Sequence, residues 1–527
     1  MLAAFSALFG VVSPTKLVFE APRPDVARKY VVCGTKTALL SDGCKDLLPL
    51  GLPFLRWKYL VELAHEEAGV SGCSRDWLFT ASDGSPSTVV AAVLPDACSR
   101  HASPVRPHSI TSLLKGSATK SADVIMMLEN AAHAGGAACA VGRAFPTFTA
   151  KTKGNAGGDA PTVKVSFATA EGALTSGYDS YAAAADGVRR AARLVDLPPD
   201  KLTTTAFVGE AKATAQRLTA QGKTVSCEVV SGDDLRDGGY GFLYGVGKAA
   251  EEPPALVVLS YLPDGGASAT ETVCLVGKGI VYDTGGLSLK SKEGMPGMKA
   301  DCGGAAALLA AFEAAVEIGL PKGKALHLVL CLAENAIGPG AVRNDDVLTG
   351  LSGLTCEINN SDAEGRLVLA DGAAHATCLP PKLPGLGETQ QPDLIVDMAT
   401  LTGAQLVATG KKHAGIVANT EGVERAAVVA GRLSGDTVHP LPFVPEFYFP
   451  EFKSAVADMK NSVKDRNNAQ ASCAATFIHE HLHEDYKGGW LHVDLAGPAW
   501  IDERGTGFGV GLTLAILGCE GFQGEGA

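Results

Sequence analysis

Two segments of this 527-residue chain place ionisable side chains inside sequence that is otherwise apolar and rich in glycine. The side chains in residues 276–301 and 360–371 include Lys278, Asp283, Lys290, Asp301, Asp362, Glu364 and Arg366. Charged groups in such surroundings are costly to bury unless they pair with opposite charges or bind metal. If the two segments meet in space, their four carboxylates and two lysines predict a metal site with catalytic groups beside it.

The spacing within the second segment favours a ligand site. Asp362, Glu364 and Arg366 alternate, so in extended backbone all three would point to one side. Two carboxylates on one side suit a divalent metal, and an arginine beyond them suits an anion held bidentately. A solvated polar loop is the alternative, and for Lys278 it is a salt bridge to a nearby aspartate. Spacing alone does not separate a catalytic site from an ion-pair network.

A competing pattern, H-E-x-x-H, occupies residues 479–483. In mononuclear zinc proteases two such histidines lie one helical turn apart and bind zinc, with the glutamate as base. The alternative is an exposed polar end of a helix that starts near Ala469. The run is polar almost throughout, and His492 is the one downstream candidate for a third ligand. We therefore favour the helix end, with at most an adventitious surface metal site.

The elements that must position these residues alternate between strands and helices after residue 181, which indicates a mostly parallel α/β sheet. The expected strands are 255–261, 272–277, 325–335, 393–403, 413–419 and 490–497. The expected helices are 205–218, 303–318, one that begins at 371 and one that begins near 469. The strands are apolar almost throughout, which indicates burial on both faces. Lys278 and the Thr400–Gly403 turn fall just past strand ends, where open α/β sheets place ligands.

The length of the chain predicts two domains. We expect a smaller N-terminal α/β domain over residues 1–180, without a catalytic motif, and a larger C-terminal α/β domain over residues 181–527. The boundary is a helix at 181–194. In the first domain we expect strands at 16–21, 29–34 and 87–94, a helix at 121–134 and a hairpin loop at 151–161.

The composition narrows the function classes. A net charge of −12 without a block of basic residues argues against nucleic acid or an anionic membrane as the main partner. Many of the 13 cysteines lie in apolar runs and no paired CxxC spacing occurs, which favours a reducing, cytoplasmic setting. No basic residue precedes Lys16, whereas secretory and mitochondrial signals need them. We therefore expect a poorly ordered end or a first buried element there.

Four stretches together resemble the leucine aminopeptidase (cytosol aminopeptidase) family of two-metal exopeptidases. They read VGKGIVYDTGGLSLK, MKADCGGAAA, NSDAEGRLVLADG and DMATLTGA, and the resemblance covers roughly residues 182–517. Ser361 replaces the threonine of the family's usual NTDAEGRL, a conservative change. Residues 457–470 depart from the family's glycine-rich wording and resemble its branch of probable or nonspecific aminopeptidase-like proteins.

The resemblance implies two divalent metal ions in each subunit, Zn²⁺ or Mn²⁺, with Mg²⁺ and Co²⁺ as alternatives. Asp283 and Glu364 would bridge the two ions. Lys278 and Asp301 would complete the tighter site, and Asp362 the more exchangeable one. Because every ligand position is intact, we expect an active enzyme.

The resemblance also implies the other functional residues. Lys290 would stabilise the tetrahedral oxyanion, and Arg366 would hold a bicarbonate ion that acts as general base. The residues bordering the pocket and the leaving side of the peptide would be Met298, Thr400, Leu401 and Gly403. The resemblance further implies a homohexamer that cleaves peptides with a free α-amine, and we expect it to prefer leucine and similar apolar residues.

Two other function classes remain to be weighed. Some members of the family bind DNA, but the net charge of −12 argues against that role here. A scaffolding protein with a decayed site is the other alternative, and the complete ligand set argues against it.

Overall fold

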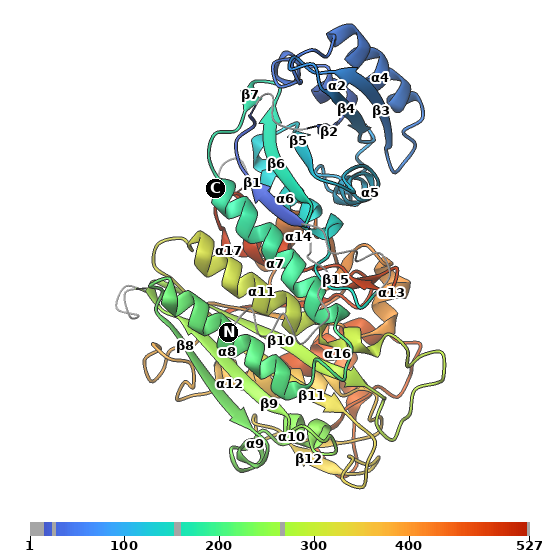
Figure 1. Ribbon diagram of the computed structural model, residues 1–527. Coiled ribbons are helices and arrows are strands. Elements are labelled where there is room, and N and C mark those ends of the chain that lie inside the picture. The colour runs from blue at the N-terminus through green and yellow to red at the C-terminus, as the bar shows by residue number, and fades with distance from the viewer. Residues whose placement is uncertain (1–14, 24–27, 152–159, 264–268, 524–527) are drawn as a thin grey trace. The chain divides into compact units, whose positions relative to one another are not determined.

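The computed structural model describes residues 15–23, 28–151, 160–263 and 269–523 (Figure 1). Two expectations fall outside these ranges: an element within residues 1–14 and most of the hairpin loop at 151–161. Among the described residues, no helix is both long enough and apolar enough to cross a membrane.

The chain forms two compact units. Unit 1 comprises the described parts of Met1–Arg189, Ala430–Thr437 and Leu514–Ala527, and unit 2 comprises those of Arg190–Val429 and Val438–Thr513. Compactness by itself does not define where a domain begins, so the boundary between residues 180 and 181 stays a prediction.

Unit 1 is built on a sheet of order β1-β6-β5-β2-β4-β3, with β7 beside β6. The pairs are parallel except those of the edge strands β3 and β7. The strands are β1 (Lys16–Phe19), β2 (Lys29–Gly34), β3 (Cys73–Thr80), β4 (Pro86–Val93), β5 (Ala122–Met127), β6 (Thr162–Thr169) and β7 (Gly172–Ala173). Successive residues of β2 point to opposite faces of the sheet, so that Val31 lies in one apolar core and Val32 in another. Helices cover both cores: α5 (Pro107–Ser117) and α6 (Ala134–Ala144) on one face, α4 (Phe54–Glu66) on the other.

The helix expected at residues 121–134 is wrong. Residues Ala122–Met127 form β5, which lies between β6 and β2 in the sheet, and the helix α6 begins only at Ala134. Val124 and Met126 face one core of unit 1, while Ile125 and Met127 face the other. A strand buried on both faces is apolar at every position, so its pattern cannot be told from that of a buried helix.

Unit 2 contains the larger sheet, of order β16-β15-β18-β14-β10-β11-β9-β8. Its central strands β18, β14, β10 and β11 are all parallel, while β8, β9 and β15 each take part in antiparallel pairs. The strands are β8 (Val225–Ser231), β9 (Ala255–Tyr261), β10 (Glu271–Asp283), β11 (Lys324–Asn335), β14 (Leu394–Ala399), β15 (Ala414–Ala418), β16 (Val438–Pro440) and β18 (Gly489–Asp494). The predicted α/β class with a mostly parallel central sheet is confirmed.

Helices cover both faces of this sheet. On one face α10 (Gly241–Gly247), α12 (Gly365–Thr377) and α16 (Gln470–Glu480) share an apolar core with β10, β11 and β14. On the other, α11 (Gly303–Ile318) packs closely: a side chain at Gly277 of β10 would lie 2.8 Å from the Cα of Ala305. Glycine is therefore required where this helix crosses the strand.

Candidate metal centre

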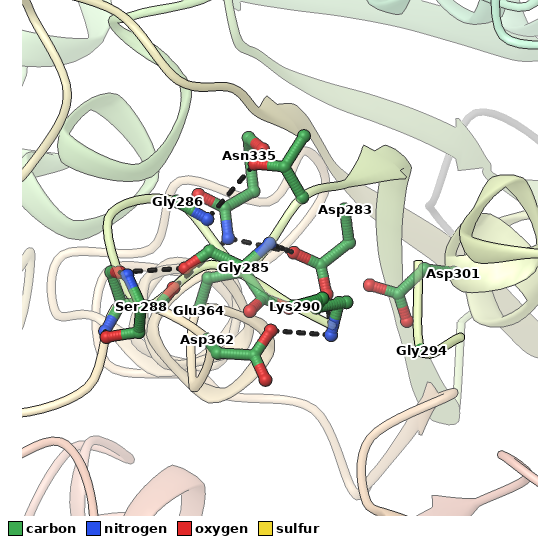
Figure 2. A network of polar contacts seen from close by, with 12 residues as sticks. Asp283, Gly285, Gly286, Ser288, Lys290, Gly294, Asp301, Asn335, Asp362 and Glu364 are labelled. Carbon is green, nitrogen blue, oxygen red and sulfur yellow. Dashed lines mark hydrogen bonds and ion pairs between the residues drawn. The ribbon is translucent and has the colours of Figure 1, made fainter. Parts of the chain in front are cut away.

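The parallel strands of unit 2 bring the two charged segments together. Asp283 ends β10, and the following loop leads to a short 3₁₀ helix, η3 (Met298–Cys302), which carries Asp301. Glu364 directly precedes α12. Figure 2 shows Lys290 between Asp283 and Asp362, with the Asp301 carboxylate directed toward the same group. Segments about 80 residues apart in the sequence thus meet at the carboxyl edge of the sheet, as expected for this fold.

Lys278 lies within β10 and not past its end, because the strand runs six residues beyond the predicted limit. Its buried Nζ lies 2.8 Å from Asp301 Oδ1 and 3.0 Å from Glu364 Oε1, and it donates to the Thr400 carbonyl at 3.1 Å. Burial opposes the charge of this lysine, but the neighbouring carboxylates outweigh burial and raise its pKa. Without metal, Lys278 is the counter-ion of the carboxylates.

Asp283 is held from both sides. Its Oδ1 accepts hydrogen bonds from the Gly285 amide at 2.9 Å and from Asn335 Nδ2 at 2.8 Å. Its Oδ2 lies 2.7 Å from Lys290 Nζ, which also lies 2.5 Å from Asp362 Oδ1. Burial opposes the charge of Lys290 as well, yet Asp283 and Asp362 raise its pKa, so this lysine is cationic at neutral pH.

Three buried carboxylates approach one another too closely to be stable without cations. Asp283, Asp301 and Glu364 each offer an oxygen within 4.8 Å of those of the other two, the one such group among the described residues. Burial, together with the neighbouring carboxylates, raises the pKa of both Glu364 and Asp301 above the ordinary range of a carboxyl group. Glu364 Oε2 and Asp301 Oδ2 have no hydrogen-bond partner in the described chain. Free carboxylate oxygens facing one point fit a divalent metal ion.

The backbone around the second segment differs from the extended one expected. Glu364 has φ −75° and ψ −32°, and α12 begins at Gly365, six residues before the predicted start at 371. Arg366 is therefore helical, and the alternation with Glu364 and Asp362 does not reflect a strand. A side chain at Gly365 would place its Cβ 2.6 Å from Lys278 Nζ, so the helix can approach the lysine only at a glycine.

Arg366 is a buried cation with free hydrogen-bond donors. Its Nε and one terminal nitrogen, Nη1, have no hydrogen-bond partner among the described residues. Burial lowers the pKa of this guanidinium to about 10, which still leaves it charged at neutral pH. The guanidinium lies 6.0 Å from the Phe452 ring centroid. An unpaired buried arginine that lines a pocket is suited to an anionic ligand.

Two residues outside the charged set hold the two segments together. Asn335, at the end of β11, donates through Nδ2 to Asp283 (Figure 2). The same Nδ2 donates to the Ser361 carbonyl at 3.1 Å. Ser361 Oγ donates to the Gly285 carbonyl at 2.8 Å and accepts from the Ser288 amide at 2.7 Å. Sequence reasoning missed Asn335 because a lone asparagine that ends an apolar strand has no motif around it.

The seven ionisable groups of the two charged segments open into one pocket of about 500 Å³. Every residue predicted for the site lines it: Lys278, Asp283, Lys290, Met298, Asp301, Asp362, Glu364, Arg366, Thr400, Leu401 and Gly403. Trp500, Lys411, Arg466 and Gln470 also line it and were not predicted. The one signal for Arg466 and Gln470 was the departure of residues 457–470 from the family's wording. The roles assigned to the predicted residues stay predictions.

The histidine motif does not form a zinc site. Helix α16 ends at Glu480, so His479 and His483 are not on successive turns of one helix. His479 packs against Phe443 and Trp490, and His492 pairs with Asp397 at 2.5 Å. The expected helix end is confirmed, since α16 begins at Gln470 and ends at the exposed Glu480, but the run is not exposed throughout. His481 is 1% exposed, contacts the rings of Phe242 and Phe477, and shares a 2.7 Å hydrogen bond with Ser352 Oγ.

Comparison with known proteins agrees with this geometry. Residues 189–514 match the model of the "Cytosol aminopeptidase family, catalytic domain", and residues 31–154 match "M17 aminopeptidase N-terminal domain 2". The human "Probable aminopeptidase NPEPL1" is 48% identical over 432 residues, which cover 81% of this chain and 79% of that protein.

Solved structures show the same likeness. The apo structure of leucyl aminopeptidase from Trypanosoma cruzi superposes with a TM-score of 0.85 at 39% identity, covering 96% of this chain and 97% of that one. The bottromycin maturation enzyme BotP, solved in complex with Mn, gives a TM-score of 0.73 at 28% identity, covering 93% of this chain and 99% of that one.

Proposed function

The chain belongs to the cytosol aminopeptidase family, and from that membership we propose a two-metal aminopeptidase that prefers leucine and other apolar N-terminal residues. It is a metallo-aminopeptidase, a hydrolase, like the other members of this family. The observation that carries the two-metal proposal is the buried group Asp283, Asp301 and Glu364, with carboxylate oxygens that lack partners within the described chain.

Five residues would hold the ions. Asp283 and Glu364 would bridge them, Lys278 and Asp301 would complete one site, and Asp362 the other. When bound, two divalent ions supply an activated water and a polarised scissile carbonyl. Lys278 must then lose the proton that it holds beside the carboxylates, because an amine binds metal only when neutral. We propose Mn²⁺ or Zn²⁺, with Mg²⁺ and Co²⁺ as alternatives.

The remaining charged residues act on the substrate. Lys290 keeps its proton and would face the oxygen on which negative charge develops in the transition state, where stabilisation raises the rate. Arg366, whose buried donors lack partners among the described residues, would hold a bicarbonate ion as general base. Met298 and Leu401 give the pocket apolar walls, which supports a preference for leucine.

We also propose a cytoplasmic homohexamer. The family's description as cytosol aminopeptidases supports the location, and light scattering after gel filtration would test the assembly. A particle of six times the 54.1 kDa chain mass is expected, and a monomer would contradict it.

Hydrolysis of leucinamide and of N-acetyl-leucinamide in Mn²⁺, with and without chelator, tests the reaction. Cleavage of the unblocked substrate alone, and its loss on chelation, is the expected result. Asp362→Ala should abolish cleavage, and His483→Ala, outside the pocket, should leave it intact. Cleavage of the acetylated substrate, or dependence on His483 alone, would overturn the proposal.

A further inference from the structure

Two cationic side chains that line the pocket, Lys411 and Arg466, have no role in the proposed reaction. The four carboxylates of the pocket all belong to the proposed metal ligands. Apart from these and the three cations already assigned, the charged residues that line it are Lys411 and Arg466. A pocket with no spare negative charge, in a chain of net charge −12, is complementary to an anionic group on the ligand.

Arg466 stands on a loop that is fixed beside the metal-binding segment. The loop joins β17 (Met459–Lys460) to α16 and begins at Asn461, which is fully buried. Asn461 Nδ2 donates to the Asn360 carbonyl at 2.7 Å, and its Oδ1 accepts from the Asn359 amide at 2.9 Å. The loop that carries the arginine is thereby anchored next to Asp362.

Lys411 stands on a second anchored turn. It follows helix α13 (Gly403–Thr409), whose buried Gln405 donates to the carbonyls of Gly410 at 3.0 Å and of His413 at 2.7 Å. The same Gln405 accepts from the Gly497 amide at 2.6 Å. Both cations therefore extend from backbone that is held in place.

Both side chains are exposed, and none of the described residues forms an ion pair with either of them. Some exposed cations of unit 2 are paired, such as Arg425 with Glu421 and Arg343 with Asp346, and others, such as Lys464, are not. What distinguishes Lys411 and Arg466 from these is that both line the pocket. An exposed cation without an internal partner can give its full charge to a ligand.

We propose that Lys411 and Arg466 recognise a substrate carboxylate on the leaving side of the scissile bond. The inference rests on the proposed function. A substrate whose α-amine binds at the metals presents its carboxylates further along the chain. A volume of about 500 Å³ suits a ligand of dipeptide size. The substrate class is thus dipeptides with a free α-carboxylate, or peptides with an acidic second residue.

The test compares kcat/KM for Leu-Gly with that for Leu-Gly-amide, which lacks the terminal charge. The wild-type enzyme should favour the free dipeptide about fivefold, the size of one or two solvent-exposed charge interactions. In the double variant Lys411→Gln/Arg466→Gln the enzyme should lose this preference, so that the kcat/KM values for Leu-Gly and Leu-Gly-amide become about equal. Raising the salt concentration should lower the ratio in the wild type alone. Lys464→Gln removes a neighbouring exposed cation that does not line the pocket, and it should keep the wild-type ratio.

Two further substrate pairs locate the carboxylate. Leu-Asp-amide against Leu-Asn-amide places it on the second side chain, and Glu-Gly-amide against Gln-Gly-amide places it on the released residue. The proposal is supported if the double variant lowers the kcat/KM ratio of Leu-Gly to Leu-Gly-amide or that of Leu-Asp-amide to Leu-Asn-amide. The proposal is overturned if the double variant changes only the ratio of Glu-Gly-amide to Gln-Gly-amide, or if every ratio is the same in wild type and variant. Absence of all hydrolysis would instead refute the proposed function.

Discussion

At the scale of single residues, the site depends on groups that hold the carboxylates as much as on the carboxylates themselves. The Oδ1 atom of Asp283 accepts one hydrogen bond from Asn335 and a second from the Gly285 amide, which together fix the orientation of its carboxylate. Asp283 could be predicted to belong to the site, because a charged residue in an apolar, glycine-rich segment is unusual. Asn335 could not be predicted, since its partner lies 52 residues away and the pairing depends on the register of β10 with β11.

We expect Asn335→Ala to weaken Mn²⁺ binding about tenfold, the usual loss when a group that orients a metal ligand is removed. Isothermal titration of the metal-free protein measures this affinity directly. Asn467→Ala, at an exposed asparagine outside the pocket, is the matched control. Equal Mn²⁺ affinity in Asn335→Ala and the control would show that Asn335 has only a structural role.

At the scale of secondary-structure elements, the approach of α12 to β10 positions the lysine and glutamate. The order of strands β9, β10, β11, β14, β15 and β18 could be predicted because their apolar runs are long and bounded by glycine and proline. The edge strands β8 and β16 and the short helix α10 were not predicted. The ends could not be predicted either: β10 continues through Lys278 because the cluster compensates the buried charge, and α12 begins early at Gly365. Both are tertiary effects that a local pattern does not contain.

Gly365→Ala tests this approach. The new Cβ would lie 2.6 Å from Lys278 Nζ and 2.9 Å from Leu401 Cδ1, so the helix or the lysine must move. We expect at least a tenfold loss of kcat for leucinamide with the circular dichroism spectrum retained. Gly209→Ala on α8 (Thr204–Ala220), which has nothing within 4 Å of the added Cβ, should keep wild-type activity. A fully active Gly365→Ala enzyme would refute the tight packing.

His481, the residue that follows the last residue of helix α16, makes the stability of the fold sensitive to pH. Burial lowers the pKa of His481 to about 3 from an ordinary value of 6.5, so the folded protein keeps it neutral while the unfolded chain protonates it. Below pH 6.5 the unfolded state binds more protons. The free energy of unfolding therefore falls as the pH decreases, by up to about 1.4 kcal/mol per pH unit for this one group.

Urea unfolding at pH 7 and pH 5 measures this dependence. His481→Gln should lose less stability between the two pH values than the wild type, whatever its stability at pH 7. His439→Gln, at an exposed histidine, should keep the wild-type dependence. An unchanged pH dependence in His481→Gln would show that this histidine is not held neutral by burial.

At the scale of the whole molecule, the chain places its chemistry in unit 2 and returns to unit 1 with two late segments, Ala430–Thr437 and Leu514–Ala527. The class of fold could be predicted from the alternation of elements and the length. The late segments could not, because contacts such as the 2.9 Å ion pair between Arg143 and Asp436 join residues 293 apart and leave no local signal.

The measurement that tests the central claim most directly is the metal content of the purified enzyme beside that of Glu364→Gln. The account predicts two Mn²⁺ or Zn²⁺ ions per wild-type chain by mass spectrometry of the metals. The variant loses a bridging carboxylate, so it should hold fewer ions and hydrolyse leucinamide at least about a hundredfold more slowly. A wild-type enzyme that is fully active without metal, or a variant that keeps two ions and full activity, would contradict the account.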